Sequence, residues 1–281
     1  MLKYQIHKLS KGGREARAVL LEDILTSDVF GLMAYFPYDL LLKPFLEKVS
    51  FKNPESHFSV PEVEPIDVHF WKSFNWPDSL PNLDRESIEP DVVIEWSDLV
   101  LIVEAKFVSP TDSEELLREY LVGANEAGPD QMFFLLLIDK NLSPPDVSYQ
   151  REVTKVEISK CIRRRISDLG CEDGFPPTEV ASTVLWTNWQ SFYELVEDLL
   201  QDQAARESAG IGKIGINILR DVQQVLERKG LIPFEALSLS EMDKYKIDLS
   251  TLGKIGLRVT DPLPLLSRLR LDPDALTAIL S

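Results

Sequence analysis

Two carboxylates and one lysine stand at the ends of two neighbouring apolar stretches of the sequence. Asp91 opens a stretch rich in Val and Ile, and Glu104 and Lys106 closely follow the apolar run 99–103. Because side chains alternate between the two faces of a strand, Glu104 and Lys106 are expected on one face and Ala105 on the other. A continuous apolar run is typical of a strand covered on both faces, and charges beside such a strand need a compensating partner.

The two apolar stretches flank Ser97-Asp98, a polar pair suited to a turn, and therefore predict a β-hairpin. If the hairpin closes at this pair, Asp91 and Glu104 fall nearly opposite each other, and such cross-strand neighbours have Cβ atoms about 5 Å apart. Two carboxylates and Lys106 would then share one small volume.

This combination of residue types indicates a particular chemistry. Carboxylates that close together repel unless a cation lies between them, and hard oxygen ligands suit Mg²⁺ or Mn²⁺. Such an ion activates water and neutralises charge on a phosphate, while a lysine orients the water or offsets negative charge. The site therefore suits phosphodiester hydrolysis. The alternative is a set of ordinary surface groups that form a weak, exposed ion pair.

The motif Pro90-Asp91 followed by Glu104-Ala105-Lys106 resembles that of the PD-(D/E)XK nuclease superfamily, and residues 219–234 resemble the closing helix of its stand-alone bacterial type. The resemblance implies a metal-dependent endonuclease that cleaves DNA, with Asp91, Glu104 and the Ala105 carbonyl as ligands of Mg²⁺ or Mn²⁺. It gives Lys106 the role of positioning the attacking water. Its family context includes defence against foreign DNA.

Glu22 is a further candidate ligand. It lies on the apolar stripe of a helix predicted over residues 14–36, where apolar residues recur at three- and four-residue steps. In the resembled superfamily an acidic residue of the first helix often supplies another metal contact, and this role falls to Glu22. The alternative is a carboxylate held by a basic neighbour one turn away, but no residue three or four positions from Glu22 is basic.

Glu115 lies in a helix predicted over residues 113–124, with a helix cap at Asp112. Many relatives of the resembled type have a glutamine near this position, beside the metal centre. We interpret Glu115 as part of a solvated helix face. Should the hairpin register differ, the alternative ligands are three acidic residues that precede it: Asp84, Glu86 and Glu89.

The order of the predicted elements indicates an α/β fold. The apolar run 131–139 predicts a strand directly after the helix, and a strand–helix–strand order implies a right-handed parallel crossover. A hairpin joined to a parallel strand makes a mixed central sheet flanked by helices, which is the restriction-endonuclease-like core that the resemblance implies. We expect a nuclease-like domain over residues 1–235 and a C-terminal extension over 236–281 that docks on it or binds a partner.

The remaining helices and strands are predicted from periodicity and apolar runs. Helices are expected at 37–49, 151–165, 189–200 and 211–229, and strands in 51–70 and at 180–186. The aromatic cluster of Trp71, Phe74 and Trp76 could stack on bases, although a core or interface position is the more common use of such residues.

The amino-acid composition limits the classes of protein to which the chain can belong. The chain has 281 residues, of which 44% are hydrophobic and 27% charged, as in a globular protein, and it has no apolar run long enough to cross a membrane. No secretory signal is recognisable and there are only two cysteines, so we expect a cytoplasmic protein with reduced thiols.

The charge is the main objection to a nuclease. A net charge of −16 argues against non-specific coating of nucleic acid, so DNA contact must use a local patch or a partner's surface. The most basic stretch is 151–165, where a helix would expose the residues proposed to contact phosphates: Lys160, Arg163, Arg164 and Arg165. The alternative is a solvated helix side that balances nearby acids.

A second hypothesis follows from the same charge. The chain could be a non-catalytic, nuclease-like subunit that binds a protein partner through an acidic surface. A protein partner or a homo-oligomer is the expected assembly. The net charge favours this hypothesis, whereas the intact set of Asp91, Glu104 and Lys106 opposes it.

Overall fold

The computed structural model describes residues 14–232, apart from 82, 84–86, 108–110, 129, 142–145, 149–154, 173, 176, 203–206, 208 and 209. The described residues belong to the first of two units, Met1–Ile232, and the second unit is Pro233–Ser281. The expected C-terminal extension, residues 236–281, lies outside the described residues.

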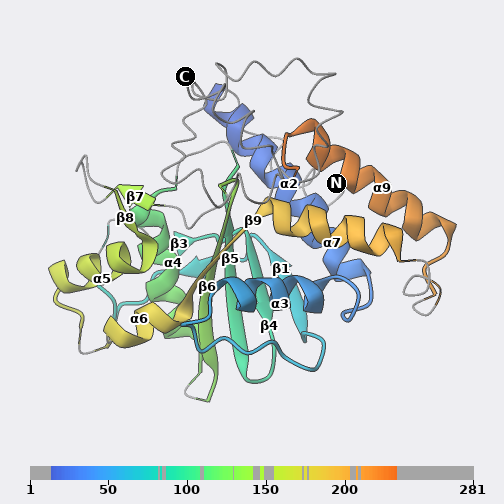
Figure 1. Ribbon diagram of the computed structural model, residues 1–281. Coiled ribbons are helices and arrows are strands. Elements are labelled where there is room, and N and C mark those ends of the chain that lie inside the picture. The colour runs from blue at the N-terminus through green and yellow to red at the C-terminus, as the bar shows by residue number, and fades with distance from the viewer. Residues whose placement is uncertain are drawn as a thin grey trace, which may run out of the picture. The chain divides into compact units, whose positions relative to one another are not determined.

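A five-stranded mixed sheet forms the centre of the first unit (Figure 1). Its strands, in spatial order, are β1 (Asp67–Phe70), β4 (Val92–Glu95), β5 (Leu99–Ala105), β6 (Met132–Asp139) and β9 (Val184–Asn188). The pairs β1–β4 and β4–β5 are antiparallel, and the pairs β5–β6 and β6–β9 are parallel. The predicted mixed sheet of an α/β fold is therefore confirmed.

The central hairpin forms as predicted. Val92 pairs with Val103, and the turn is closed by a hydrogen bond of 2.8 Å from the Trp96 N–H to the Leu99 carbonyl. Continuing this register by one residue brings Asp91 opposite Glu104. The connection from β5 to the parallel strand β6 is helix α4 (Ser113–Glu126), whose N-terminus is capped by the Asp112 carboxylate, which accepts the Glu114 N–H at 2.9 Å.

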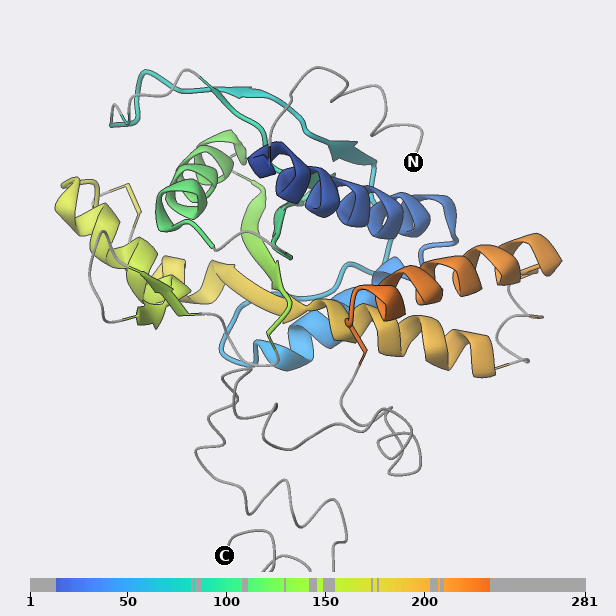
Figure 2. The ribbon, with the colours of Figure 1, turned by 90° about the horizontal axis from the view of Figure 1, so that it is seen from above.

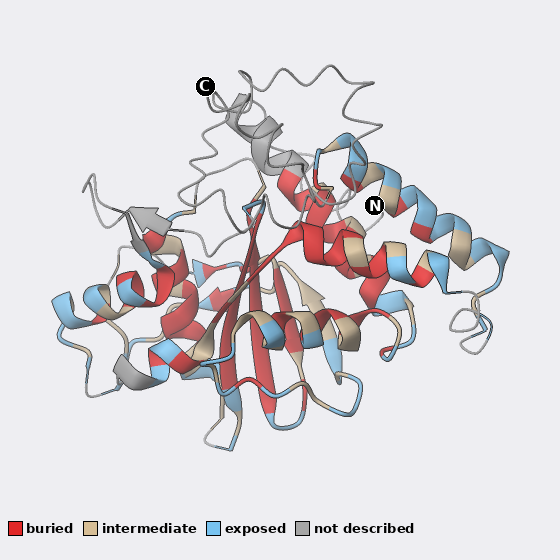
Figure 3. Cartoon of the chain, in the orientation of Figure 1, coloured by how far each residue is buried: buried red, intermediate tan, exposed pale blue. Residues whose placement is uncertain are grey.

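Helices cover both faces of the sheet, with α4 on one side and α3 and α7 on the other (Figure 2). One buried core joins the sheet to α2 (Arg14–Tyr35), α3 (Leu42–Lys52), α7 (Trp189–Gln201) and α9 (Lys213–Arg228). The opposite core joins it to α4, α5 (Ile158–Asp168) and α6 (Pro177–Thr183). Strand β5 is buried along its whole length, and β4 and β6 are each buried at all residues but one (Figure 3), which explains their continuous apolar runs.

Two short ribbons complete the described elements. Strand β2 (Phe74–Asn75) pairs with β3 (Ser87–Ile88), and β7 (Asp146–Ser148) pairs with β8 (Lys155–Glu157), both antiparallel. Among the described helices, none combines the length and the hydrophobicity that crossing a lipid bilayer requires.

Several predicted boundaries differ from those in the structure. The second helix, expected at 37–49, is Leu42–Lys52, and only Asp67–Phe70 of the stretch 51–70 joins the sheet. Residues 180–183 belong to a short helix that buries Val180 beside α4 and α5, so the strand predicted at 180–186 begins at Val184. The basic helix begins only at Ile158, because Lys155–Glu157 is paired in a β-ribbon.

Candidate active site

The end of strand β5 carries the predicted charged pair on the face that meets α4. Glu104 and Lys106 are 4% and 8% exposed, and Ala105 is buried in the opposite core. The Lys106 ammonium forms an ion pair with Glu104 and a second one, of 2.6 Å, with Glu115 on α4. The exposed ion pair considered from the sequence is therefore wrong, because both side chains of the pair are buried.

Asp91 lies beside this pair. Its Oδ2 accepts the Ala105 N–H at 2.9 Å, which links the start of β4 to the end of β5. Burial and the nearby charge of Glu104 raise the pKa of Asp91 well above its usual range. The backbone is held as well, since the Asp91 carbonyl accepts the Trp71 N–H at 3.2 Å. The structure thus brings Asp91, Glu104 and Lys106 together.

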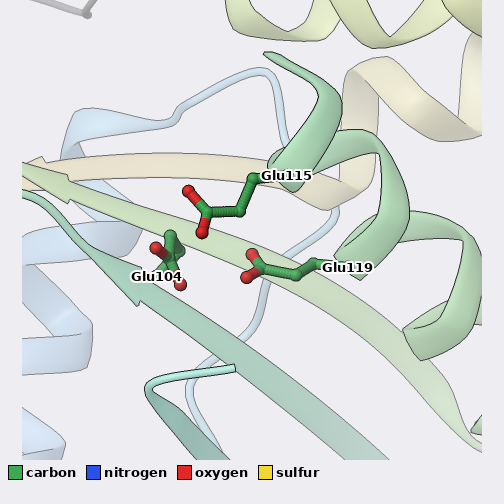
Figure 4. Close-up of side chains that lie close together, drawn as sticks. All are labelled: Glu104, Glu115 and Glu119. Carbon is green, nitrogen blue, oxygen red and sulfur yellow. The ribbon is translucent and has the colours of Figure 1, made fainter. Parts of the chain in front are cut away.

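Helix α4 adds two carboxylates, Glu115 and Glu119, which converge on Glu104 (Figure 4). Each of the three glutamates offers an oxygen within 4.8 Å of the other two, and we call this set the glutamate cluster. The interpretation of Glu115 as solvated is corrected, because its side chain is 37% exposed and is bound to Lys106. Sequence reasoning missed Glu119; the signal was its spacing of four residues from Glu115, which places both on one helix face.

Negative charge exceeds positive charge in this cluster. Burial raises the pKa of Glu104 in spite of Lys106, and burial together with the charge of Glu104 raises that of Glu119 well above its usual range. Burial alone lowers the pKa of Lys106, but Glu104 and Glu115 raise it above its ordinary value, so the ammonium stays charged. A hydrogen bond joins Glu104 and Glu119, which requires that one of the two carries a proton when no cation is bound.

Helix α2 reaches the same end of the sheet. Glu22 is buried, and its Oε1 accepts the Phe107 N–H at 2.7 Å, one residue beyond Lys106. Its neighbour Asp23 is also buried, and the charge of Asp23 contributes to the raised pKa of Asp91. On the apolar side of the sheet, the Trp189 indole N–H donates to the Lys106 carbonyl at 3.0 Å. The backbone that follows Glu104 is therefore held from both sides.

The donor set fits a hard divalent cation. The available ligands are carboxylate oxygens, most of them buried, with a single ammonium as counter-charge. Asp91, Glu104 and the Ala105 carbonyl would hold such an ion, and Glu22 lies at the same end of β5. A cation would also satisfy Glu119, whose Oε2 is buried with no hydrogen-bond partner among the described atoms.

The basic residues proposed to contact phosphates lie on α5. Arg165 is not on a solvent face, because its side chain is 14% exposed and forms a 2.6 Å ion pair with Glu114 of α4. The Lys160 ammonium lies 3.1 Å from Glu157, and the Arg163 Nε–H donates to the Ser159 carbonyl. Arg164 is exposed. These contacts favour the alternative of a helix side that balances nearby acids.

The other candidates from the sequence do not join the site. Glu89 is exposed, and Asp84 and Glu86 lie outside the described residues. Phe74 is buried in the core beside α4, and the partly buried Trp76 packs against this core, which favours a structural use of both residues over base stacking. A cavity of about 550 Å³ lies between α2 and the sheet edge, lined among others by Tyr35, Ile66 and Phe70, and none of the site carboxylates lines it.

No family model, curated protein or solved structure matches the chain. The function has to be inferred from the chemistry of the site and from the motif in the sequence.

Proposed function

We propose that this protein is a metal-dependent endodeoxyribonuclease of the PD-(D/E)XK type, with a restriction-endonuclease-like core. The observation that carries the proposal is the convergence of Asp91, Glu104 and Lys106 at the ends of two adjacent strands, in a buried setting rich in carboxylates. Charged groups are buried in this way only when they are paired or bind a cation.

Each residue has a distinct role in the proposed mechanism. Asp91, Glu104 and the Ala105 carbonyl would bind Mg²⁺ or Mn²⁺, with Glu22 as a further contact. A divalent ion bound there supplies Lewis-acid stabilisation of the phosphate and lowers the pKa of a coordinated water. Lys106 positions the attacking water and offsets developing negative charge, while Glu115 holds the Lys106 ammonium in place.

The structure supports the positional precision that such a mechanism needs. The Ala105 N–H fixes the Asp91 carboxylate, and the Trp189 indole fixes the carbonyl of Lys106. Side chains mounted on strand ends and tied by such bonds keep their geometry better than side chains on loops.

The proposal extends to the cellular setting. We propose that the substrate is DNA, met in the cytoplasm, and that cleavage serves defence against foreign DNA. With a net charge of −16, binding must rely on a local patch, for which Lys160, Arg163 and Arg164 remain the candidates, or on a protein partner.

A plasmid-nicking assay tests the activity. The purified full chain should nick supercoiled DNA with Mg²⁺ or Mn²⁺ and lose this activity in EDTA. Asp91→Asn and Lys106→Ala should each lower the rate by about 100-fold or more, because each removes a group that acts on the reacting phosphate or water. Lys48→Ala, on α3, is the matched control and should keep the wild-type rate. Equal nicking by the wild type and Lys106→Ala would rule out the mechanism.

The second candidate is a non-catalytic subunit that binds a basic protein partner. The net charge of −16 and the inward pairing of Arg165 favour it. Calorimetric titration with Mn²⁺ separates the two candidates: the nuclease should bind the ion and lose this binding in Glu104→Ala, whereas a subunit without a metal role should show no such loss.

A further inference from the structure

We propose that Lys229, at the end of helix α9, binds a phosphate of the DNA strand beside the one that is cleaved. The inference rests on the proposed function, because it names a substrate contact of the same site. It assigns a phosphate contact to the end of strand β5, in addition to any that the basic side of α5 makes. DNA binding tests it without any cleavage.

The last turn of α9 brings Lys229 to the candidate site. Helix α9 runs back along α7, and its last turn lies beside α2 at the end of the sheet where β5 ends (Figure 1). The ammonium of Lys229 lies 4.9 Å from the centre of the Phe107 ring. Phe107 follows Lys106 in the chain, and its N–H is the one that the Glu22 carboxylate accepts. Lys229 therefore lies beside the backbone that carries the candidate site.

The backbone of Lys229 is fixed by the way in which α9 ends. Gly230 has a φ of +70°, the left-handed conformation that glycine adopts without strain, and the Leu231 N–H donates to the Leu226 carbonyl at 3.0 Å. Leu231 is buried in the core and anchors the chain after this turn. The helix end thus holds Lys229 at this place without any partner for its ammonium.

The charge of Lys229 has no carboxylate partner in the part of the chain that the structure describes. Its ammonium forms no ion pair with the described residues, and it lies over the Phe107 ring instead. Burial lowers the pKa of Lys229, and the charge of Asp28 offsets this effect only in part. A half-buried ammonium without such a partner is unexpected in a chain with 46 acidic and 30 basic residues. An anionic ligand would supply the missing partner.

The candidate site needs such a cation for its substrate. Lys106 already forms ion pairs with Glu104 and Glu115, and a bound divalent ion would be neutralised by its own acidic ligands. Neither leaves positive charge in excess for DNA, which binds to cations that replace its counterions. A strand whose phosphate reaches Lys106 carries its neighbouring phosphates past the same end of β5. The ammonium of Lys229 is placed there to bind one of them.

The alternative is that Lys229 only stabilises the end of α9. A cation at the C-terminus of a helix interacts favourably with the helix dipole, and the alkyl stem of a lysine covers apolar surface such as the Phe107 ring. Both effects act on the stability of the fold and leave DNA binding unchanged. The two roles therefore differ in the quantity that a substitution changes.

DNA binding by the full-length Lys106→Ala chain, which should not cleave, tests the contact. A short labelled duplex is titrated in Mg²⁺ by fluorescence anisotropy. In this background Lys229→Gln should weaken binding about 10-fold at low salt and reduce the slope of log K against log salt by about 1, because one phosphate contact is lost. Lys229→Arg should restore both quantities, since it keeps the charge. Lys213→Gln, exposed in the first turn of α9, is the matched control and should bind like its parent.

The kinetics of the otherwise wild-type chain provide a second measurement. Lys229→Gln should raise KM for plasmid DNA about 10-fold and change kcat by less than about twofold, because the lost contact binds a phosphate that does not react. Lys229→Met keeps an apolar stem over Phe107 and should show the same rise in KM, which separates lost charge from lost packing.

The outcomes separate this inference from the proposed function. Unchanged DNA binding in Lys229→Gln, even with a lower melting temperature, would overturn the phosphate contact and leave the nuclease intact. An equal loss of binding in Lys213→Gln would also overturn it. Salt-dependent binding that requires Lys229, without any cleavage by the wild type, would support the contact and count against the nuclease. A wild-type chain that neither binds nor cleaves DNA would overturn both.

Discussion

The two faces of strand β5 are both buried, yet they differ in chemistry. On one face Leu99, Leu101, Val103 and Ala105 pack against the core that holds α2, α3, α7 and α9. On the other face the apolar pattern of Val100 and Ile102 changes to charge at Glu104 and Lys106, where the strand meets α4. One strand can therefore serve as a rigid support and as a reactive edge, because its side chains alternate between two separate environments.

The two faces contribute differently to the stability of the fold. The apolar face gains stability from every buried side chain. The charged end of the other face gathers like charges, and burial raises the pKa values of Asp91, Glu104 and Glu119. Ionisable groups whose pKa values are shifted by burial and by neighbouring charges are typical of functional sites. Three measurements test this contrast between the two faces.

The largest effect is expected on the apolar face. Leu101→Ala should lower the free energy of unfolding by about 2–5 kcal/mol, because it leaves a cavity in a fully buried layer. Chemical denaturation of the full chain measures this loss. Glu119→Gln, on the charged side, should change the same quantity by less than about 1 kcal/mol, because it keeps the shape and removes a disfavoured charge. Equal losses in the two variants would abolish the contrast between the faces.

The second effect is a pH dependence that arises from the charged side alone. The folded-state pKa values of Asp91, Glu104 and Glu119 lie above the ordinary carboxyl values of 3.8 and 4.5, so the folded chain holds protons that the unfolded chain releases. Stability from this source is complete at pH values below the ordinary carboxyl pKa and is lost as the pH rises through the raised folded-state values.

Calorimetric scans in EDTA should therefore show a melting temperature that falls as the pH rises above the ordinary carboxyl range, and a smaller fall in Glu119→Gln. Mn²⁺ should restore the melting temperature at the higher pH by binding the ionised carboxylates. A melting temperature that rises over this range in EDTA, and is indifferent to Glu119→Gln, would contradict the raised pKa values.

The smallest effect on stability is expected at the N-terminus of α4, the helix that packs against the charged end of β5. Asp112→Ala removes the N-terminal cap of α4, the helix that carries Glu115 and Glu119, and should cost about 1 kcal/mol. The exposed Asp78→Ala provides the matched control and should change stability by less than about 0.5 kcal/mol. Thermal unfolding of both variants checks the difference; the cap has no energetic role if the two melt alike.

Much of the scaffold could be predicted from short-range patterns. The hairpin around Ser97-Asp98, the cap at Asp112 and the parallel strand after α4 all follow from local signals, and the structure confirms them. Glu119 and Arg165 could not be placed in this way. Both lie on helices whose rotation about their own axes is set by packing against distant elements, so whether they face solvent or a partner is a long-range outcome.

Local patterns in the sequence place Asp91, Glu104 and Lys106 at the ends of paired strands, because strand periodicity and turn position depend on near neighbours in the chain. Long-range packing, in contrast, turns Glu115 and Glu119 of α4 toward Glu104 and brings Glu22 of α2 to the same end of the sheet. Each helix packs on the sheet as a rigid unit, in the orientation that buries its apolar face. The polar residues that they carry into the interior then depend on how the entire face packs, not on any local pattern.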